Sequence, residues 1–210
     1  MYKRVRLSCR HKRDQEDFER RQAALKVAQK AERKGLINLF YFDEAGFSQQ
    51  GCCIPYAWQQ KGEQLRIPSV KSRRVNVLAF MNRDNDLFHY SVIGSVSSDE
   101  VIRVFDDFAE KMQDQKYSSD DRYTLVIVDN ASVHTSQKFT EKRDNWMIEK
   151  RLIVCYLPTY SPELNLIEIL WHKVKYVWLN LMAIMNFDEF KKELNRVFDA
   201  VGKEYIISFV

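Results

Sequence analysis

Hydrophobic residues form short runs along this chain, and the period of each run predicts an element. Three nearly unbroken apolar runs are typical of strands buried on both faces of a sheet. These runs fall at residues 36–42, 124–128 and 152–157. Two more strands are predicted at residues 75–81 and Leu87–Ile93, joined by a polar hairpin turn at residues 82–86.

Helical spacing marks the segments between and around these strands. A highly charged helix is expected at residues 14–34, ended by Gly35 and polar enough to bridge modules rather than enter a core. Ser97 and Glu100 form a capping box before an amphipathic helix. Three further helices are expected at Gln137–Lys150, after Pro162, and after Asn186, which is placed as an N-cap.

The order of these elements predicts the fold class. A strand, a two-stranded hairpin, and then helices alternating with two strands fit an α/β fold with a mixed five-stranded sheet and helices on both faces. This is the order of a ribonuclease-H-like fold. We expect a basic arm and linker helix over residues 1–35, followed by the α/β domain over residues 36–210.

Composition excludes several classes of protein. Of the 210 residues, 45% are hydrophobic and 30% are charged, which is ordinary for a soluble globular protein. No apolar run is long enough to span a membrane, and the N-terminus does not resemble a secretory signal. The cysteines show no CxxC spacing, so we expect reduced thiols in a cytoplasmic protein.

Basic residues cluster in two places, although the net charge of +4 is itself weak evidence for a nucleic-acid partner. The N-terminal cluster is either a solvated tail or an arm that contacts phosphates. The second cluster is either a DNA-backbone contact or a solvated strand edge. The N-terminal cluster contains Lys3, Arg4, Arg6, Arg10, Lys12 and Arg13, and the second contains Lys71, Arg73 and Arg74.

Two aspartates follow buried strands. Asp43 and Asp129 each come directly after an apolar run, and ligands gather at the carboxyl ends of strands in open α/β sheets. If the two strands are neighbours, the carboxylates converge and repel each other unless a cation lies between them. Oxygen ligands favour Mg²⁺ or Mn²⁺. The alternative is that each aspartate only ends a strand or begins a turn.

A third acid lies beyond a turn bracketed by Pro158 and Pro162. Glu168 is on the border of the predicted buried face of the following helix, where an uncompensated charge is costly. A surface glutamate at the edge of that face is the alternative. Trp171 and Trp178 are expected to be core residues rather than platforms for base stacking.

These acids lie in three segments that resemble the motifs of the mariner-type transposase superfamily, in particular its bacterial insertion-sequence branch. The segments are YFDEAGF at residues 41–47, VDNASVH at 128–134 and LPTYSPELNLIEILW at 157–171. Trp58 and the KGE segment at residues 61–63 resemble the tryptophan and turn that follow the first motif. The resemblance extends from about Tyr2 to the C-terminus, with one departure at Leu166, where proline is common.

The resemblance implies a DDE catalytic domain for cut-and-paste transposition. It implies that Asp43, Asp129 and Glu168 bind two Mg²⁺ or Mn²⁺ ions for DNA cleavage and strand transfer, usually at TA targets. Glu44 adjoins Asp43 and is expected to point to the other side of the strand. Asn130 and His134 are candidates for contacts with the acids or with DNA, although His134 could equally be a polar residue that opens a helix.

The implied partners are transposon ends, target DNA and a second copy of the chain, in a nucleoid-associated bacterial setting. The helix-turn-helix modules usual in the family are not found in these residues, so we expect weak, non-specific DNA binding. Two alternatives stay open. One is a catalytically silent DNA-binding protein derived from a transposase, and the other is a host nuclease of the same fold, such as a ribonuclease H or a junction resolvase.

Overall fold

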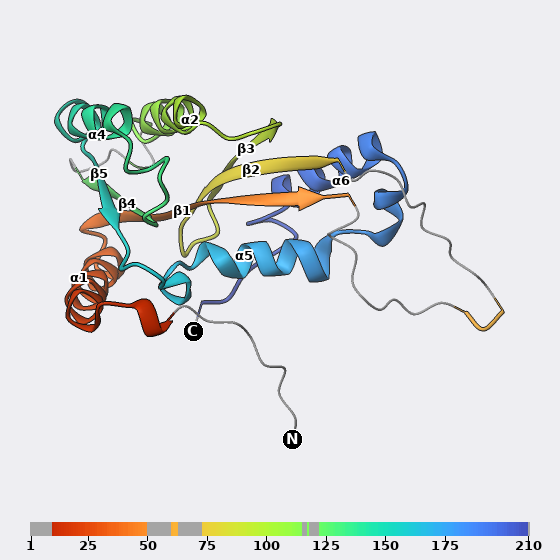
Figure 1. Ribbon diagram of the computed structural model, residues 1–210, viewed down its shortest axis with the longest axis horizontal. Helices are drawn as coiled ribbons and strands as arrows, with labels where there is room; N and C mark the ends of the chain where they lie inside the picture. Colours follow the sequence, from red (N-terminus) through yellow and green to blue (C-terminus); the bar gives the residue numbers. More distant parts are fainter. Residues whose placement is uncertain (1–9, 50–59, 63–72, 115–116, 118–121, 210) are drawn as a thin grey trace, which may run out of the picture.

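The computed structural model describes residues 10–49, 60–62, 73–114, 117 and 122–209. Its centre is one mixed sheet of five strands in the order β3-β2-β1-β4-β5 (Figure 1). The strands are β1 Ile37–Ser48, β2 Arg74–Met81, β3 Leu87–Ile93, β4 Tyr123–Val128 and β5 Leu152–Tyr156. In the described part of the chain, no helix is long and apolar enough to cross a membrane.

Strand β1 has a different partner on each side. It pairs parallel with β4 from Ile37↔Tyr123 to Tyr41↔Ile127, and antiparallel with β2 from Tyr41↔Met81 to Ser48↔Arg74. The expected mixed sheet is therefore confirmed, and the two strands that precede Asp43 and Asp129 in the sequence are neighbours, as the convergence of these carboxylates requires. The expected end of the first strand was wrong, because pairing with β2 carries β1 past Phe42 as far as Ser48.

Helices cover both faces of this sheet, as the sequence predicts. Helices α2 and α4 lie over one face, while α1, α5 and α6 lie over the other (Figure 1). The five helices are α1 Gln15–Arg33, α2 Ser98–Lys111, α4 Gln137–Lys150, α5 Ile167–Lys173 and α6 Phe187–Asp199. A 3-10 turn, Pro162–Leu164, precedes α5, and a π-helical turn, Val174–Trp178, follows it.

The expected caps and turn are present. Ser97 accepts a hydrogen bond from the backbone N–H of Glu100, and Asn186 accepts from the first turn of α6. In the hairpin turn, the side chain of Asn82 accepts from the backbone N–H groups of Asp84 and Asp86.

Helix α1 was expected to bridge modules rather than enter a core, but in the structure it packs on the sheet. Leu25 is 7% exposed and belongs to the core on the α5 side of the sheet. Gln29 donates to the hydroxyl of Tyr41 at 2.9 Å, and Arg21 donates to the carbonyl of Tyr156 at 3.0 Å. One buried leucine and two side-chain hydrogen bonds therefore attach this polar helix to the sheet.

Alternation along β1 divides the core into two clusters. Phe40 and Phe42 face α2 and α4, whereas Leu39 and Tyr41 face α1 and α5. On the α2 side, Phe105 of α2 is fully buried at the centre of an aromatic cluster. Its ring centroid lies 4.7–5.1 Å from those of Phe42, Phe80, Phe139 and Trp146.

Phe105→Ala should lower the free energy of unfolding by about 3–5 kcal/mol, because removal of the ring leaves a cavity among aromatic side chains that several elements hold in place. Denaturant unfolding measures the change. Val27→Ala on α1, at a side chain 69% exposed, is the control and should change stability by less than about 0.5 kcal/mol. Similar losses for both variants would contradict this account of the core.

Candidate active site at the carboxyl end of the central strands

Three acidic residues meet where β1 extends past its parallel partner. Asp129 follows the last residue of β4, and Asp43 lies two residues past the last β1–β4 pair. Asp43 is inside β1, not at its end, because β2 continues the sheet there. Glu168 is in the first turn of α5, which packs on the β1 face to which Asp43 points.

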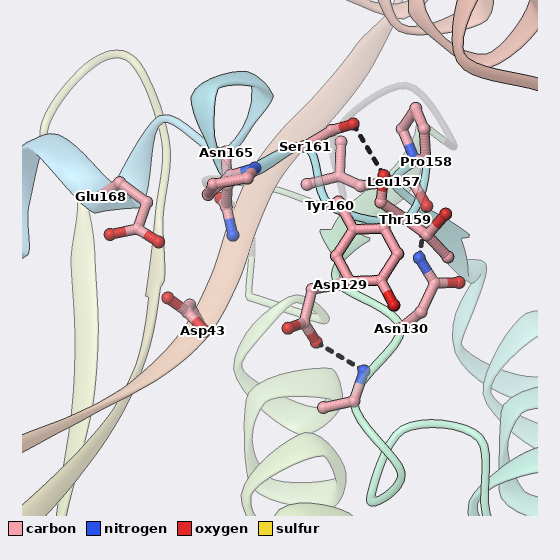
Figure 2. Close-up of a pocket in the computed structure, with 12 residues that line it drawn as sticks. Asp43, Asp129, Asn130, Leu157, Pro158, Thr159, Tyr160, Ser161, Asn165 and Glu168 are labelled. Carbon is pink, nitrogen blue, oxygen red and sulfur yellow. Dashed lines mark hydrogen bonds between the residues drawn. The ribbon is translucent and has the colours of Figure 1, made fainter. Parts of the chain in front are cut away.

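The three acids line one pocket of about 380 Å³. Figure 2 shows the carboxyl groups of Glu168 and Asp43 directed toward each other, with Asp129 on the other side of Asp43. The sequence-predicted convergence is therefore present in the fold. The remaining wall comes from the turn between β5 and α5 and from the residues after β4.

The turn before α5 is tied directly to β1. Asn165 is 5% exposed, and its side-chain amide donates to the carbonyl of Phe42 at 3.2 Å. The backbone N–H of Glu168 in turn donates to the carbonyl of Asn165 at 3.2 Å. Asn165 therefore sets how far Glu168 lies from Asp43. Leu166 has φ −63°, a value that proline also adopts, so leucine preserves the turn expected at this position.

Trp171 holds the carboxyl group of Asp43. Its indole N–H donates to Oδ2 of Asp43 at 2.9 Å, and its ring is 3% exposed, as expected for a core residue. The pKa of Asp43 is raised to about 7, mainly by burial and also by the charges of Glu44 and Glu168, against the lowering effect of the Trp171 hydrogen bond. Without a bound metal ion, the site therefore favours the protonated form of the Asp43 carboxyl group.

Asp129 is held from the opposite face of the sheet by His134. The Nδ1 atom of this fully buried imidazole lies 2.8 Å from Oδ1 of Asp129, and Nε2 lies 3.1 Å from Oε1 of Glu44. Burial alone would lower the pKa of His134, but the two carboxylates raise it to about 10. Both ring nitrogens then donate, so an imidazolium lies between two acids.

The pKa of Asp129 is correspondingly low. Although burial acts to raise it, hydrogen bonds from His134 and from the backbone N–H of Ala131 hold it below its usual value. Glu44 contacts His134 and Asp43 contacts Trp171, so the two side chains leave β1 on opposite faces, as expected. Asn130 lines the pocket and donates to the carbonyl of Leu157 at 2.6 Å.

The fit of the pocket to a metal ion rests on its donor set. Among the described residues, no group of three or more His, Cys, Asp or Glu side chains is already arranged to hold an ion. Three carboxyl groups nevertheless share one pocket, and the pKa values of both Asp43 and Glu168 are raised, first by burial and also by neighbouring acids. Carboxylate oxygens are the ligands that divalent cations such as Mg²⁺ prefer, so this donor set is chemically suited to such an ion.

The basic candidates that the structure describes do not form one patch. Arg13 is bound to Glu163 at 2.7 Å with its side chain 9% exposed, and Arg10 lies 3.3 Å from the same carboxylate. Arg73 stacks on Phe187 at 3.9 Å, whereas Arg74 lies across Gly46 and donates to the side chain of Asn76 at 2.8 Å. Lys12 is exposed. Lys3, Arg4, Arg6, Trp58 and Lys71 lie outside the described residues.

Sequence reasoning missed the roles of Trp171 and Asn165. Both lie three residues from Glu168: Trp171 is one helical turn after it in α5, and Asn165 is in the turn that leads into α5. That spacing was a usable signal for contacts near the acid. The partners of the two side chains, Asp43 and Phe42, are more than 120 residues away in sequence, and only the fold identifies them.

Asp43→Asn should stabilise the metal-free protein at high pH, because the amide still accepts from Trp171 and carries no charge. The unchanged protein should lose stability as the pH rises from 3.8, the ordinary value for Asp, to about 7, because the folded state keeps a proton that the unfolded chain releases. The gain in Tm in EDTA should therefore grow from pH 5 to pH 8. Asp99→Asn, at an exposed carboxyl group on α2, is the control and should show no such growth.

Comparison with known proteins places this chain in a family. A model of the DDE superfamily endonuclease family matches residues 38–191. No curated protein matches the sequence. Among solved structures, the chain is similar to the Mos1 mariner paired end complex with Mn, with a TM-score of 0.58 and 14% identity over 97% of this chain and 64% of that one.

Two further Mos1 structures agree. The strand transfer complex gives a TM-score of 0.59 at 14% identity over 97% of this chain and 63% of that one. The catalytic domain of Mos1 mariner transposase gives 0.58 at 14% identity over 89% and 83%. The chain thus spans about 64% of the length of the Mos1 chain in the paired end complex. These likenesses show the expected ribonuclease-H-like fold, and the match to the family model over most of the chain shows that this protein belongs to the DDE superfamily endonuclease family.

Proposed function

We propose that this chain is the catalytic domain of a transposase, which cuts DNA and joins the freed end to a target, with Asp43, Asp129 and Glu168 as the metal-binding acids. The observation that carries the proposal is the meeting of these three acids in one pocket of a DDE-family fold. Structures similar in fold include complexes of Mos1 with a left transposon end and with Mg or Mn.

The reaction is an in-line displacement at phosphorus. Water attacks the scissile phosphate, a new P–O bond forms, and the 3′-oxygen leaves with a proton as a free hydroxyl. In the second step, that hydroxyl attacks a phosphate of the target, for which TA is the proposed sequence. A new P–O bond joins the freed end to the target, the P–O bond to the target's own 3′-oxygen breaks, and that oxygen leaves with a proton as a hydroxyl. Two divalent ions, Mg²⁺ or Mn²⁺, supply activation of the attacking oxygen and charge stabilisation at the phosphate when bound.

The residues of this chain fix the positions of the acids. Trp171 orients Asp43 through its indole N–H, and His134 together with the backbone of Ala131 orients Asp129. Asn165 holds the start of α5, and therefore Glu168, against β1. Such prior positioning lowers the reorganisation that the reaction requires.

The proposed partners are DNA ends, target DNA and a second copy of the chain in the active complex. The paired transposon ends named for Mos1 support the pairing of two chains. Phosphates, rather than base edges, are the proposed main contacts, so binding should be weak and should fall steeply with salt.

Asp43→Ala, Asp129→Ala and Glu168→Ala should each abolish Mg²⁺- or Mn²⁺-dependent nicking of duplex DNA, because each removes one proposed ligand. Circular dichroism and Tm check that the fold is retained, and Mn²⁺ titration should show weaker metal binding. Glu189→Ala, at an exposed glutamate of α6, is the control and should retain activity.

Three results would contradict the proposal. Nicking that survives loss of any of the three acids would remove that acid from the metal site. A preference for RNA–DNA hybrids would favour a host nuclease, and a complete lack of metal-dependent nicking by the unchanged chain would favour a silent DNA-binding protein.

Replacing Lys3, Arg4, Arg6 and Lys12 by Gln should flatten the salt dependence of DNA binding. The slope of log affinity against log salt should fall by roughly 0.9 for each phosphate that the N-terminal arm no longer neutralises. Arg10 and Arg13 are left in place because they bind Glu163 in the turn before α5. Titrations of two duplexes, one with and one without inverted-repeat ends, at two salt concentrations measure the effect.

The matched control replaces four lysines of α4 and α6 that are paired with acids on α2 and α6, namely Lys138, Lys142, Lys191 and Lys192. It should leave the slope close to that of the unchanged chain. Tight, salt-insensitive, end-specific binding by the unchanged chain would show that these residues read DNA sequence.

A further inference from the structure

The pocket that contains the acids has a second, apolar part. Leu157, Pro158 and Tyr160 line it together with the acids. Figure 2 shows them on the far side of Asp129 from Glu168. The three carboxyl groups can bind cations that in turn bind a phosphate. The apolar wall provides no favourable contact for a charged group. A nucleotide has both parts, a charged phosphate and a flat, largely apolar base.

Tyr160 is the aromatic residue of this wall, and its side chain is not used by the fold. It is 48% exposed although it lies in a pocket, and its hydroxyl has no hydrogen-bond partner among the described residues. The ring therefore contributes little to the core. An exposed, unpartnered ring at the edge of a pocket offers a flat face to a ligand.

The backbone of Tyr160 is strained. Its φ is +57°, in the left-handed region that glycine adopts freely and bulky side chains rarely adopt. Such conformations persist only where surrounding structure enforces them, and they gather at functional sites. A glycine would fit here without strain, so the presence of tyrosine indicates a use for the ring.

The surrounding contacts enforce this conformation. Arg13 donates to the carbonyl of Tyr160 at 2.7 Å and to Glu163 at 2.7 Å, and its guanidinium lies over the ring of Phe18 at 4.1 Å. The hydroxyl of Ser161 donates to the carbonyl of Thr159 at 3.1 Å. The turn is thus held from the N-terminal side of α1, and the backbone of Tyr160 has a fixed position beside the pocket.

We propose that Tyr160 stacks on the base of the nucleotide next to the phosphate that is cut. This inference rests on the proposed function and adds a substrate-binding residue to it. Every base has a face that can stack on an aromatic ring, so the contact tolerates any sequence. It holds the nucleotide in the pocket while the acids hold the phosphate.

Three substitutions at Tyr160 distinguish the effect of the aromatic ring from the effect of the backbone strain. Tyr160→Phe keeps the ring and loses only the unpartnered hydroxyl. Tyr160→Ala loses the ring but keeps the strain, and Tyr160→Gly loses both. The KM for cleavage of duplex DNA should rise about tenfold in both the Ala and the Gly variants, with kcat less affected, and should stay near that of the unchanged chain in the Phe variant. The Gly variant should melt a few degrees above the Ala variant.

A second readout does not depend on cleavage. Oligonucleotides that carry 5-iodouracil, bound with Ca²⁺ and irradiated, should cross-link to Tyr160, as identified by mass spectrometry. The cross-link should persist with Phe and disappear with Ala or Gly. Tyr176→Ala is the matched control, because Tyr176 is also 48% exposed but does not line the pocket.

The outcomes distinguish this inference from the proposed function. Acid-dependent cleavage with an unchanged KM in the Ala and Gly variants, or a KM restored by Gly alone, would overturn the role of the ring and leave the function standing. Cross-linking at Tyr160 without any metal-dependent cleavage by the unchanged chain would support the stacking contact and overturn the proposed cutting activity.

Discussion

Mutual repulsion among carboxyl groups is the constraint around which the site is built. Asp43, Glu44, Asp129 and Glu168 lie near one another at one edge of the sheet, and their repulsion and burial cost free energy in the absence of cations. Each of the two aspartates is held by a buried donor, Trp171 for one and His134 for the other. The fold therefore holds the two aspartates with fixed hydrogen bonds, whereas unrestrained carboxylate side chains would move apart.

The two-sided pairing of β1 makes this arrangement possible. Parallel pairing brings the end of β4 beside β1, and antiparallel pairing with β2 keeps β1 extended beyond that point. Alternation along the extended strand then sends Asp43 toward α5 and Glu44 toward His134. Two neighbouring acids in the sequence thus act on opposite faces of one sheet.

The turn before α5 links three parts of the molecule. Asn165 ties it to β1, Glu163 ties it to Arg13 before α1, and Tyr160 presents its ring to the pocket. A contact between the N-terminal segment and the turn before α5 explains why the side chain of Arg13 is only 9% exposed while its neighbour Lys12 is exposed. Part of the positive charge near the N-terminus is therefore used inside the fold, where Arg13 binds Glu163.

The sequence by itself determined the five strands, the caps at Ser97 and Asn186 and the candidate acids, because apolar runs, helical periods and motifs are properties of neighbouring residues. Tertiary structure alone decided where β1 ends and how the acids are held, because hydrogen bonds between remote elements leave no periodic trace in the chain. Arg13 looked like one more member of a basic run until the fold placed Glu163 beside it. Local sequence specifies which residues can do chemistry, and long-range packing specifies which of them meet.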